Sequence, residues 1–159
     1  LPANGGSAVA SSILGSGFAA SGVINADRRG ANWGNGGGWA DANSGVFPDW
    51  VEISFNGNKT ISEVDVFTLQ NNYLNPVEPT EAMTFTTYGV SAFDVQYWTG
   101  TGSNWITVPG GSITGNNKVW RRITFAPIST SRIRVLTNAA IDNGYTRITE
   151  VEAWGTSPL

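Results

Sequence analysis

The sequence predicts an all-β protein, an antiparallel β-sandwich of about eight strands. Apolar and polar residues alternate with a period of two in many short segments, which is the pattern of half-buried strands. Turns rich in glycine, asparagine and proline separate these segments at the roughly 8–12-residue spacing of sandwich strands. No segment combines a helical period with capping residues. The 159 residues suffice for one domain with its own core.

The first half of the chain contains three predicted strands. Residues 51–55 alternate apolar and polar side chains, and Asn56-Gly57-Asn58 provides a turn directly after them. Residues 61–69 form the second predicted strand and residues 83–88 the third.

The second half contains the remaining predicted strands. Glycine- or proline-containing turns at residues 100–102 and 109–111 separate the first of them. The segments are residues 93–97, 105–108, 119–125, 132–136 and 148–154. Short strands with turns between them favour a sandwich over a mixed fold.

Two segments are too irregular for strands. Residues 22–48 are rich in Gly, Asn, Asp and Trp, and residues 70–80 are polar and interrupted by Pro76 and Pro79. Long structured loops in a compact domain are usually functional. We therefore expect the binding residues in these loops, at one end of the sandwich.

The composition excludes several classes of function. Charged residues are only 13% of the chain, the net charge is −3, and Lys59 and Lys118 are the only lysines. Nucleic acids and anionic membranes attract basic surfaces, so neither is an expected partner. Cysteine and histidine are absent, which removes disulfides, thiol nucleophiles, Ser-His-Asp triads and imidazole zinc sites.

The ends of the sequence suggest a module of a longer protein. The chain starts abruptly at Leu1-Pro2 and closes with Thr156-Ser157-Pro158. It shows neither a signal peptide nor an apolar span of about 20 residues. We expect residues 1–159 to form one domain excised from a longer chain. The absence of cysteine fits a bacterial exported protein as well as a cytosolic one.

The order of short motifs along the chain resembles a known family. The motifs include Asp49-Trp50-Val51-Glu52-Ile53 and Arg147-Ile148-Thr149-Glu150-Val151, and the full set occupies residues 8–12, 23–27 with Trp33, 49–55, 59–64, 93–97, 105–108, 132–135 and 147–155. Together they resemble the discoidin, or coagulation factor V/VIII C-type, domain of the galactose-binding-like superfamily. Among bacterial proteins the resemblance is to family 32 carbohydrate-binding modules. It implies a jelly-roll sandwich, but the ligand only loosely, because members bind sugars, lipids and proteins.

The resemblance also implies a structural cation, usually calcium. In such domains an Asp-Gly-Asp-x-x-Thr-x-Trp loop and a Glu in the last strand share it, and Asn25-Ala26-Asp27 and Glu150 occupy these places here. Asn25 is neutral, the Gly and Thr are missing, and the loop is one residue longer, so a metal-free turn held by side chains stays an alternative. The implied oxygen ligands, which suit a hard cation, are the side chains of Asn25 and Glu150 and the backbone carbonyls of Gly22, Asp27, Gly30 and Thr149.

Five of the seven tryptophans lie in or beside predicted strands. Trp50, Trp105 and Trp154 fall where the family carries aromatics, so we expect them in the core, with Trp98 at its edge. Trp120 has the opposite parity to Ile123 and its neighbours. It either covers an open sheet face or reaches a ligand.

Trp33 and Trp39 flank the glycine-rich segment of residues 34–38. An aromatic ring presented by such a loop suits the apolar face of a sugar ring. Both are therefore candidate ligand-binding residues, although Trp33 also matches a family position that packs beside the cation loop.

The loop of residues 70–80 offers the polar part of the candidate site. It supplies Asn71 and Asn72 as amide donors and acceptors, Tyr73 as a platform and Glu78 as a hydroxyl acceptor. The alternative is a polar loop held by its own asparagine–backbone bonds. Arg121 is a further candidate donor. Arg147 is expected to pair with a carboxylate near the last strand, and residues 142–145 to form another wall.

These features predict a non-catalytic glycan-binding module and no enzyme. No spacing of carboxylates indicates the pair of a glycosidase. We expect an oligo- or polysaccharide ligand, a secreted extracellular monomer, and a catalytic or surface domain in cis that the module targets to its substrate. The alternative is a protein-binding adhesion or assembly module, which predicts an exposed apolar sheet face around Trp120.

Overall fold

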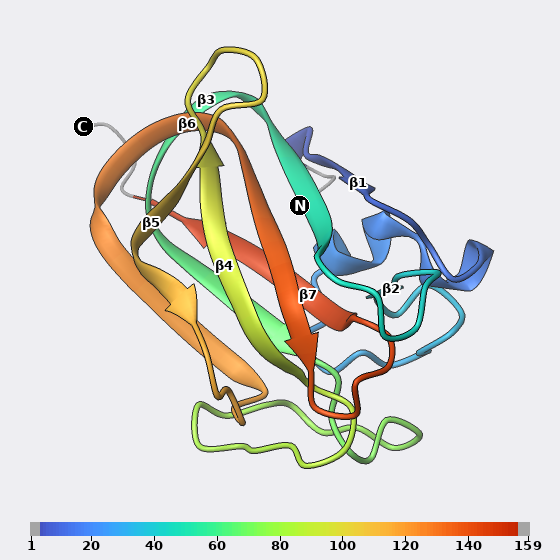
Figure 1. Cartoon of the computed structure of the whole chain (residues 1–159). Coiled ribbons are helices and arrows are strands. Elements are labelled where there is room, and N and C mark those ends of the chain that lie inside the picture. Colours follow the sequence, from blue (N-terminus) through green and yellow to red (C-terminus); the bar gives the residue numbers. More distant parts are fainter. Residues whose placement is uncertain (1–3, 156–159) are drawn as a thin grey trace.

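A computed structural model describes residues 4–155 of the chain (Figure 1). Regular structure within these residues is almost entirely β-strand, with two short 3-10 helices. The elements are β1 (Ser7–Ala10), η2 (Ser16–Phe18), η3 (Ala20–Ile24), β2 (Trp39–Ala40), β3 (Asp49–Thr68), β4 (Val90–Trp98), β5 (Trp105–Ile113), β6 (Trp120–Ala140) and β7 (Arg147–Trp154). No helix among the described residues is long and apolar enough to cross a membrane.

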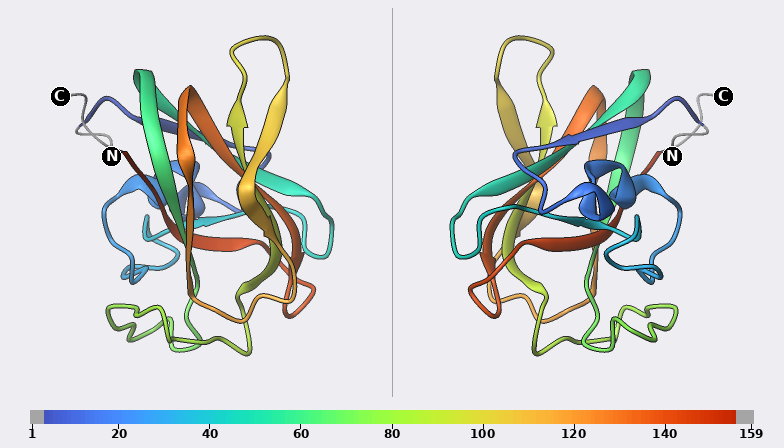
Figure 2. Two further views of the ribbon diagram at one scale, coloured as in Figure 1. Left: turned by 90° about the vertical axis from the view of Figure 1, so that its left-hand side faces the viewer. Right: turned by 90° about the vertical axis from the view of Figure 1, so that its right-hand side faces the viewer.

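Two long strands, β3 and β6, take part in both layers of the sandwich. They pair antiparallel, and the register shifts between Ser54 and Lys59, where β3 bends. Before the bend β3 also pairs with β1, and after it with β7. The second half of β6 pairs with β4, and the other edge of β4 pairs with β5. The short strand β2 pairs with β7. The bends therefore fold one hydrogen-bonded sheet into two facing layers (Figure 2).

The core lies between the two layers. Alternate residues of the strands point inward, among them Val51 and Ile53 before the bend of β3 and Val64 and Val66 after it, all at most 4% exposed. Each aliphatic side chain that is removed from water in this way contributes about 1.5–3 kcal/mol. This burial fixes which face of every strand points to solvent.

The predicted fold class is confirmed, and the strand boundaries differ. The predicted strands at 51–55 and 61–69 are the two halves of β3, and those at 119–125 and 132–136 are halves of β6. Turn residues 56–58 bend the strand without ending it. The sequence does not predict the short strands β1 and β2, and the described residues form seven strands in all.

The strand predicted at residues 83–88 is wrong. In this segment only Thr84 forms a bridge, with Lys118. The side-chain oxygen of Asn71 accepts hydrogen bonds from the backbone N–H groups of Thr86 and Thr87, both at 3.0 Å. The side chain thus satisfies backbone groups that a neighbouring strand would otherwise pair.

The sandwich has two distinct ends. The loops of residues 69–89, 114–119 and 141–146 gather at one end, which we call the loop end (Figures 1 and 2). The bend of β3 and the turn of residues 99–104 lie at the opposite end, the bend end. The segment of residues 25–38, which we call the side segment, lies along the side of the sandwich and not at the loop end, because Trp39 and Ala40 pair with β7.

Candidate functional site

Trp39 lies in the core. Its side chain is 0% exposed, and its indole N–H donates to the Ser12 carbonyl oxygen at 2.8 Å. The ring and its polar atom are therefore both used inside the fold. The prediction that Trp39 binds a ligand is wrong, because β2 pairs with β7 and carries the ring between the layers.

Trp33 packs within the segment of residues 25–38. Its ring meets the Phe18 ring edge-on, with 5.4 Å between centroids. A Cβ at Gly38 would lie only 2.5 Å from Cζ3 of Trp33, so glycine is required where the ring crosses the backbone. Trp33 remains half-buried, and these contacts support its packing role beside the cation loop.

The tryptophans expected in the core face outward instead. Trp154 is 53% exposed. Trp98 and Trp105 are half-buried, and arginines lie over their rings, Arg132 at 4.4 Å and Arg134 at 4.6 Å from the ring centroids. The expected core positions of Trp105 and Trp154 are wrong. Trp50 is likewise only partly buried.

Trp120 covers the outer face of the β7–β3–β6 layer. Its ring lies 5.1 Å from that of Phe67, and its indole N–H donates to Asp65 at 2.9 Å. The guanidinium groups of Arg28 and Arg122 lie 4.9 and 5.3 Å from the ring. Of the two roles left open by the sequence, this geometry favours the covering role.

The loop of residues 70–80 is held by its own amides. Gln70 exchanges two hydrogen bonds with the backbone of Val77, at 2.6 and 3.2 Å. Asn71 is engaged with Thr86 and Thr87, so its amide is a structural group. Asn72 and Glu78 are exposed, and both are free to contact a ligand at the loop end.

Tyr73 belongs to a connected cluster of three tyrosines and one arginine, Arg147, which we call the tyrosine cluster. The Tyr73 and Tyr88 rings meet edge-on at 5.4 Å. The Arg147 guanidinium lies 5.2 Å from the Tyr88 ring and 5.6 Å from the Tyr145 ring. It donates to Asp142 at 2.9 Å, which confirms the expected pairing of Arg147 with a carboxylate.

The cluster is assembled from three separate parts of the chain. Tyr73 comes from the loop of residues 70–80, Tyr88 from just before β4, and Tyr145 and Arg147 from the start of β7. The sequence does not reveal Tyr88, because it falls in the segment read as a strand. All three tyrosines are half-buried, so each keeps part of its surface open at the loop end.

Arg121 is fixed near the same end of the sandwich. Its Nε donates to Oδ1 of Asn116 at 2.6 Å. Asn116 is 3% exposed and in turn donates to the carbonyl oxygens of Val90 and Lys118. These bonds anchor the arginine to the loop of residues 114–119.

Glu150 is the most unusual polar residue of the structure. It is 0% exposed, and neither of its carboxylate oxygens has a hydrogen-bond partner within the described residues. Burial raises the pKa of Glu150 to about 8, the neighbouring charge of Glu152 adds to the rise, and the nearby backbone N–H groups of Asp27 and Ala26, which lie outside hydrogen-bond geometry, oppose it. A buried carboxylate without a partner is costly unless a cation or a proton neutralises it.

The part of the side segment beside Glu150, residues 25–31, consists of turns in which some backbone carbonyl oxygens accept no hydrogen bond within the described residues. Asn25 Oδ1 accepts from the backbone N–H of Asp27 at 2.9 Å, and the Asp27 carboxylate accepts from Arg29 and Ala31. The Asp27 side chain is thereby engaged, as expected for a residue that offers its carbonyl. Within residues 4–155 the carbonyls of Asp27 and Gly30 accept no hydrogen bond.

This donor set fits a hard cation. One buried carboxylate, one amide oxygen and several backbone carbonyls match the oxygen preference of calcium. The described residues contain no group of three or more His, Cys, Asp or Glu side chains that could hold a metal. Any cation here would thus depend mainly on backbone oxygens and on Glu150.

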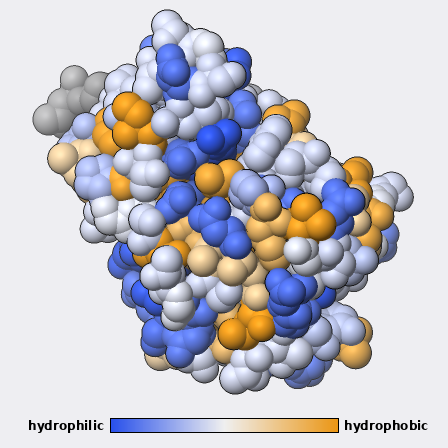
Figure 3. Space-filling model, viewed as in Figure 1, coloured by the Kyte–Doolittle hydropathy of each residue, from blue (hydrophilic) through white to orange (hydrophobic). Residues whose placement is uncertain are grey.

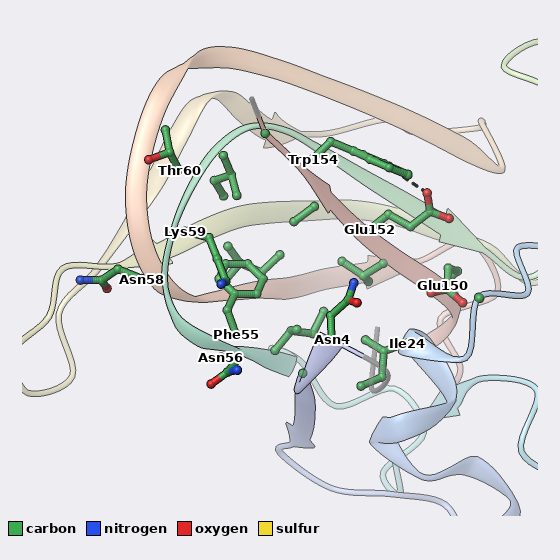
Figure 4. A pocket seen from close by; sticks show the side chains of 18 of the residues that line it. Asn4, Ile24, Phe55, Asn56, Asn58, Lys59, Thr60, Glu150, Glu152 and Trp154 are labelled. Atoms are coloured by element: carbon green, nitrogen blue, oxygen red, sulfur yellow. Dashed lines mark hydrogen bonds between the residues drawn. The ribbon is translucent and has the colours of Figure 1, made fainter. Parts of the chain in front are cut away.

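A pocket of about 830 Å³ opens at the bend end, between β3, β7 and the N-terminal segment (Figure 4). The end of β7 contributes Trp154 and Glu152, and the bend of β3 contributes Lys59 and its neighbours. We call it the bend-end pocket. Its floor is formed by Ile24, Ile53, Phe55, Ile61, Ile133 and Val151, and its rim includes Asn4, Asn56, Asn58, Lys59, Thr60, Glu152 and Trp154.

One family accounts for most of the chain. The model of the F5/8 type C domain matches residues 7–151. The chain belongs to this family. The match confirms the resemblance that the motifs indicate, whereas a search of curated protein sequences finds no significant relative.

Several solved structures similar to this F5/8 type C domain are carbohydrate-binding modules. Chitosan-binding module 2 of a Paenibacillus sp. IK-5 chitosanase/glucanase, solved with chitotriose, has 21% identity and a TM-score of 0.69, with 94% of this chain and 95% of that chain covered. The family 32 module of Clostridium perfringens NanJ, solved with galactose, has 14% identity, a TM-score of 0.63 and 93% and 92% coverage. A pectin-binding module has 18% identity, a TM-score of 0.61 and 96% and 92% coverage.

In this F5/8 type C domain the candidate residues fall into three groups. The tyrosine cluster, Asn72, Glu78 and Arg121 lie toward the loop end. The cation residues join the side segment to β7. The bend-end pocket lies opposite the loop end and was not expected from the sequence.

Proposed function

We propose that this F5/8 type C domain is a non-catalytic carbohydrate-binding module that binds a glycan at the loop end. The observation that carries the proposal is the tyrosine cluster, in which the partly exposed Tyr88 and Tyr145 rings flank Arg147 and the Tyr73 ring packs on Tyr88. The known binding modules of the same fold support it.

The chemistry of the cluster suits a sugar. A tyrosine ring removes apolar C–H groups of a sugar ring from water, while its hydroxyl bonds to sugar hydroxyls. Asp142 holds Arg147 in place, so little side-chain freedom is lost on binding. The shallow site buries few atoms, and we expect affinities in the micromolar to millimolar range.

The module would act by tethering. Bound to a glycan, it raises the local concentration of substrate for a catalytic or surface domain linked to it in cis. We place this activity outside the cell, with the module as a monomer, because the proposed ligands are extracellular polysaccharides.

The geometry around Trp120 does not favour the alternative function, a protein-binding adhesion or assembly module. It needs an apolar sheet face around Trp120, but Arg28 and Arg122 lie over that ring. On the face turned to the viewer in Figure 1, hydrophobic residues are scattered among hydrophilic ones (Figure 3).

Affinity gel electrophoresis with chitosan, pectin and a galactose polymer tests the proposal. The unchanged protein should be retarded by one of them, and Tyr73→Ala and Tyr145→Ala should each weaken retention at least about fivefold, the loss expected for one stacking ring of about 1 kcal/mol. Ile106→Ala, an exposed change on β5, is the matched control and should bind normally. Unaltered retention in both tyrosine variants would contradict the loop-end site.

We also propose that the module holds a structural calcium ion. The ligands would be Asn25 and Glu150 through their side chains and Gly22, Asp27, Gly30 and Thr149 through their carbonyls. The unpartnered, fully buried carboxylate of Glu150 supports this assignment. The ion would neutralise that carboxylate and fasten the side segment to β7.

A further inference from the structure

The bend-end pocket is separate from the loop end in both sequence and space. It is lined by the bend of β3, the end of β7, the residues before β1, Ile24, and the side segment at Ala26 and Arg28. The tyrosine cluster contributes none of its lining residues. The bend of β3 and the loops that carry the tyrosines lie at opposite ends of the sandwich (Figures 1 and 2).

The pocket combines an apolar floor with a polar rim. Isoleucines and a valine that belong to the core form most of the floor, which the buried Glu150 also lines, and amide, hydroxyl, ammonium and carboxylate groups form the rim. At about 830 Å³ it falls within the size range of small-molecule sites, which share this combination. A ligand with both an apolar face and several hydroxyls fits such a lining.

Trp154 is an exposed ring that is held in place. It is 53% exposed, and its indole N–H donates to Glu152 at 3.2 Å. Glu152 is in turn fixed by two hydrogen bonds from Arg28, at 2.7 and 2.8 Å. This chain of bonds holds the ring at the pocket rim, and within residues 4–155 no other aromatic ring stacks on it. Such a fixed ring is the preorganised platform that stacking on a sugar requires.

The opposite side of the rim supplies donors. Lys59 is one of only two lysines in the protein, and within residues 4–155 it forms no ion pair. Its ammonium group and the amides of Asn4, Asn56 and Asn58 can donate to hydroxyl oxygens. A ligand that fills the pocket can therefore contact the fixed indole on one side and these donors on the other.

We infer that the bend-end pocket is a second carbohydrate subsite that takes one or two sugar units. A sugar ring stacks on Trp154, and Lys59 donates to its oxygens. This inference rests on the proposed glycan-binding function, and it makes the module bivalent, with sites at its two ends. Bivalent binding lets one module bridge two polysaccharide chains or two stretches of one chain.

Fluorine NMR of the protein labelled with 5-fluorotryptophan tests the inference directly. Trp154→Phe identifies the Trp154 signal, and the core residue Trp39 is the internal control. Titration with chitotriose, galactose and a pectin-derived oligogalacturonate should shift the Trp154 signal with at least one sugar and leave the Trp39 signal in place. Lys59→Ala should weaken the response about three- to tenfold, the loss of one solvent-exposed hydrogen bond of about 1 kcal/mol.

The double variant Tyr73→Ala/Tyr145→Ala separates the two sites. We expect its Trp154 titration to agree with that of the unchanged protein within twofold, although retention at the loop end is lost. A Trp154 signal that no sugar shifts, or one that decanoate shifts and sugars do not, overturns the pocket assignment and leaves the loop-end site intact. Gel retention that survives in the double variant but is lost in Trp154→Phe/Lys59→Ala contradicts the loop-end site and supports the pocket.

Discussion

At the scale of single residues, residue type alone does not decide whether a side chain is buried in the fold or exposed to solvent. Trp39 and Trp154 are the same residue, yet one is 0% and the other 53% exposed. The acidic residues divide in the same way. Asp41, Asp49, Asp65 and Glu150 are buried, whereas Glu78 at the loop end is exposed. Buried carboxylates make the stability of the fold sensitive to pH.

Asp49 and Asp41 form such a buried pair at the start of β3. Thr146 binds both, through its N–H to Asp41 at 2.7 Å and its hydroxyl to Asp49 at 3.1 Å. Burial raises the pKa of Asp49 from 3.8 to about 6, and the charge of Asp41 adds to the rise. The folded state therefore holds this proton more tightly than the unfolded state.

Asp49→Asn should thus change the pH dependence of stability. The folded-state pKa is raised, so the contribution of Asp49 is fully present below pH 3.8 and is lost as the pH rises to about 6. The loss amounts to about 3 kcal/mol at most. In urea unfolding from pH 4 to 7.5, the variant should gain stability relative to the unchanged protein as the pH rises, with a plateau above about pH 6.5. A difference that does not vary with pH would contradict the pairing.

At the scale of elements, the loops at the loop end are rigid because side chains replace ladder hydrogen bonds. Asn71 joins the loop of residues 70–80 to the segment before β4 through Thr86 and Thr87. The side-chain amide of Gln70 bonds to the backbone of Val77, and that of Asn116 bonds to the backbone carbonyls of Val90 and Lys118. These amides position Tyr73, Tyr88 and Arg121 without touching the proposed ligand.

Asn71→Ala should therefore weaken glycan binding through loss of loop order. Removing the acceptor of two exposed backbone N–H groups should destabilise the fold by about 0.5–1.5 kcal/mol. Hydrogen exchange of the Thr86 and Thr87 amides should become faster. For stability and hydrogen exchange, but not for glycan binding, Asn72→Ala is the control next to it, since this exposed side chain forms no hydrogen bond within the described residues and is itself a candidate ligand contact. Equal stability of the two variants would argue against the structural role of Asn71.

At the scale of the whole molecule, the packing of the side segment against β7 depends on Glu150. This contact lies at the edge of β7 where the only strand partner within the described residues is the two-residue β2. The buried carboxylate destabilises the fold unless a cation neutralises it, so the proposed calcium ion and the fold are thermodynamically linked.

Calcium should accordingly raise the melting temperature and chelator should lower it. At a concentration of 100 times Kd, a ligand that binds only the folded state adds about 2.7 kcal/mol. Glu150→Gln should melt higher than the unchanged protein in chelator, because it removes the uncompensated charge, and should no longer respond to calcium. Magnesium is the control ion, and it should stabilise less because it tolerates this carbonyl-rich geometry poorly. An unchanged melting temperature would remove calcium from the site.

The sequence by itself determines the all-β class, the family and the general positions of the loops. The class and the loops follow from alternation and turn residues, which act locally along the chain. The family follows from the order of its motifs along the sequence. It also identifies Glu150 and the loop of Tyr73 as notable, and the pairing of Arg147 with a carboxylate.

Only the tertiary structure decides which aromatic rings are buried and which face solvent. A bulge or a bend shifts the parity of a strand, and a two-residue strand such as β2 leaves no periodic signal, so Trp39 and Trp154 exchange their expected places. The tyrosine cluster and the bend-end pocket join residues that are far apart in the chain. Their assembly depends on the long-range pairing of β3 with β6 and β7, which no local pattern encodes.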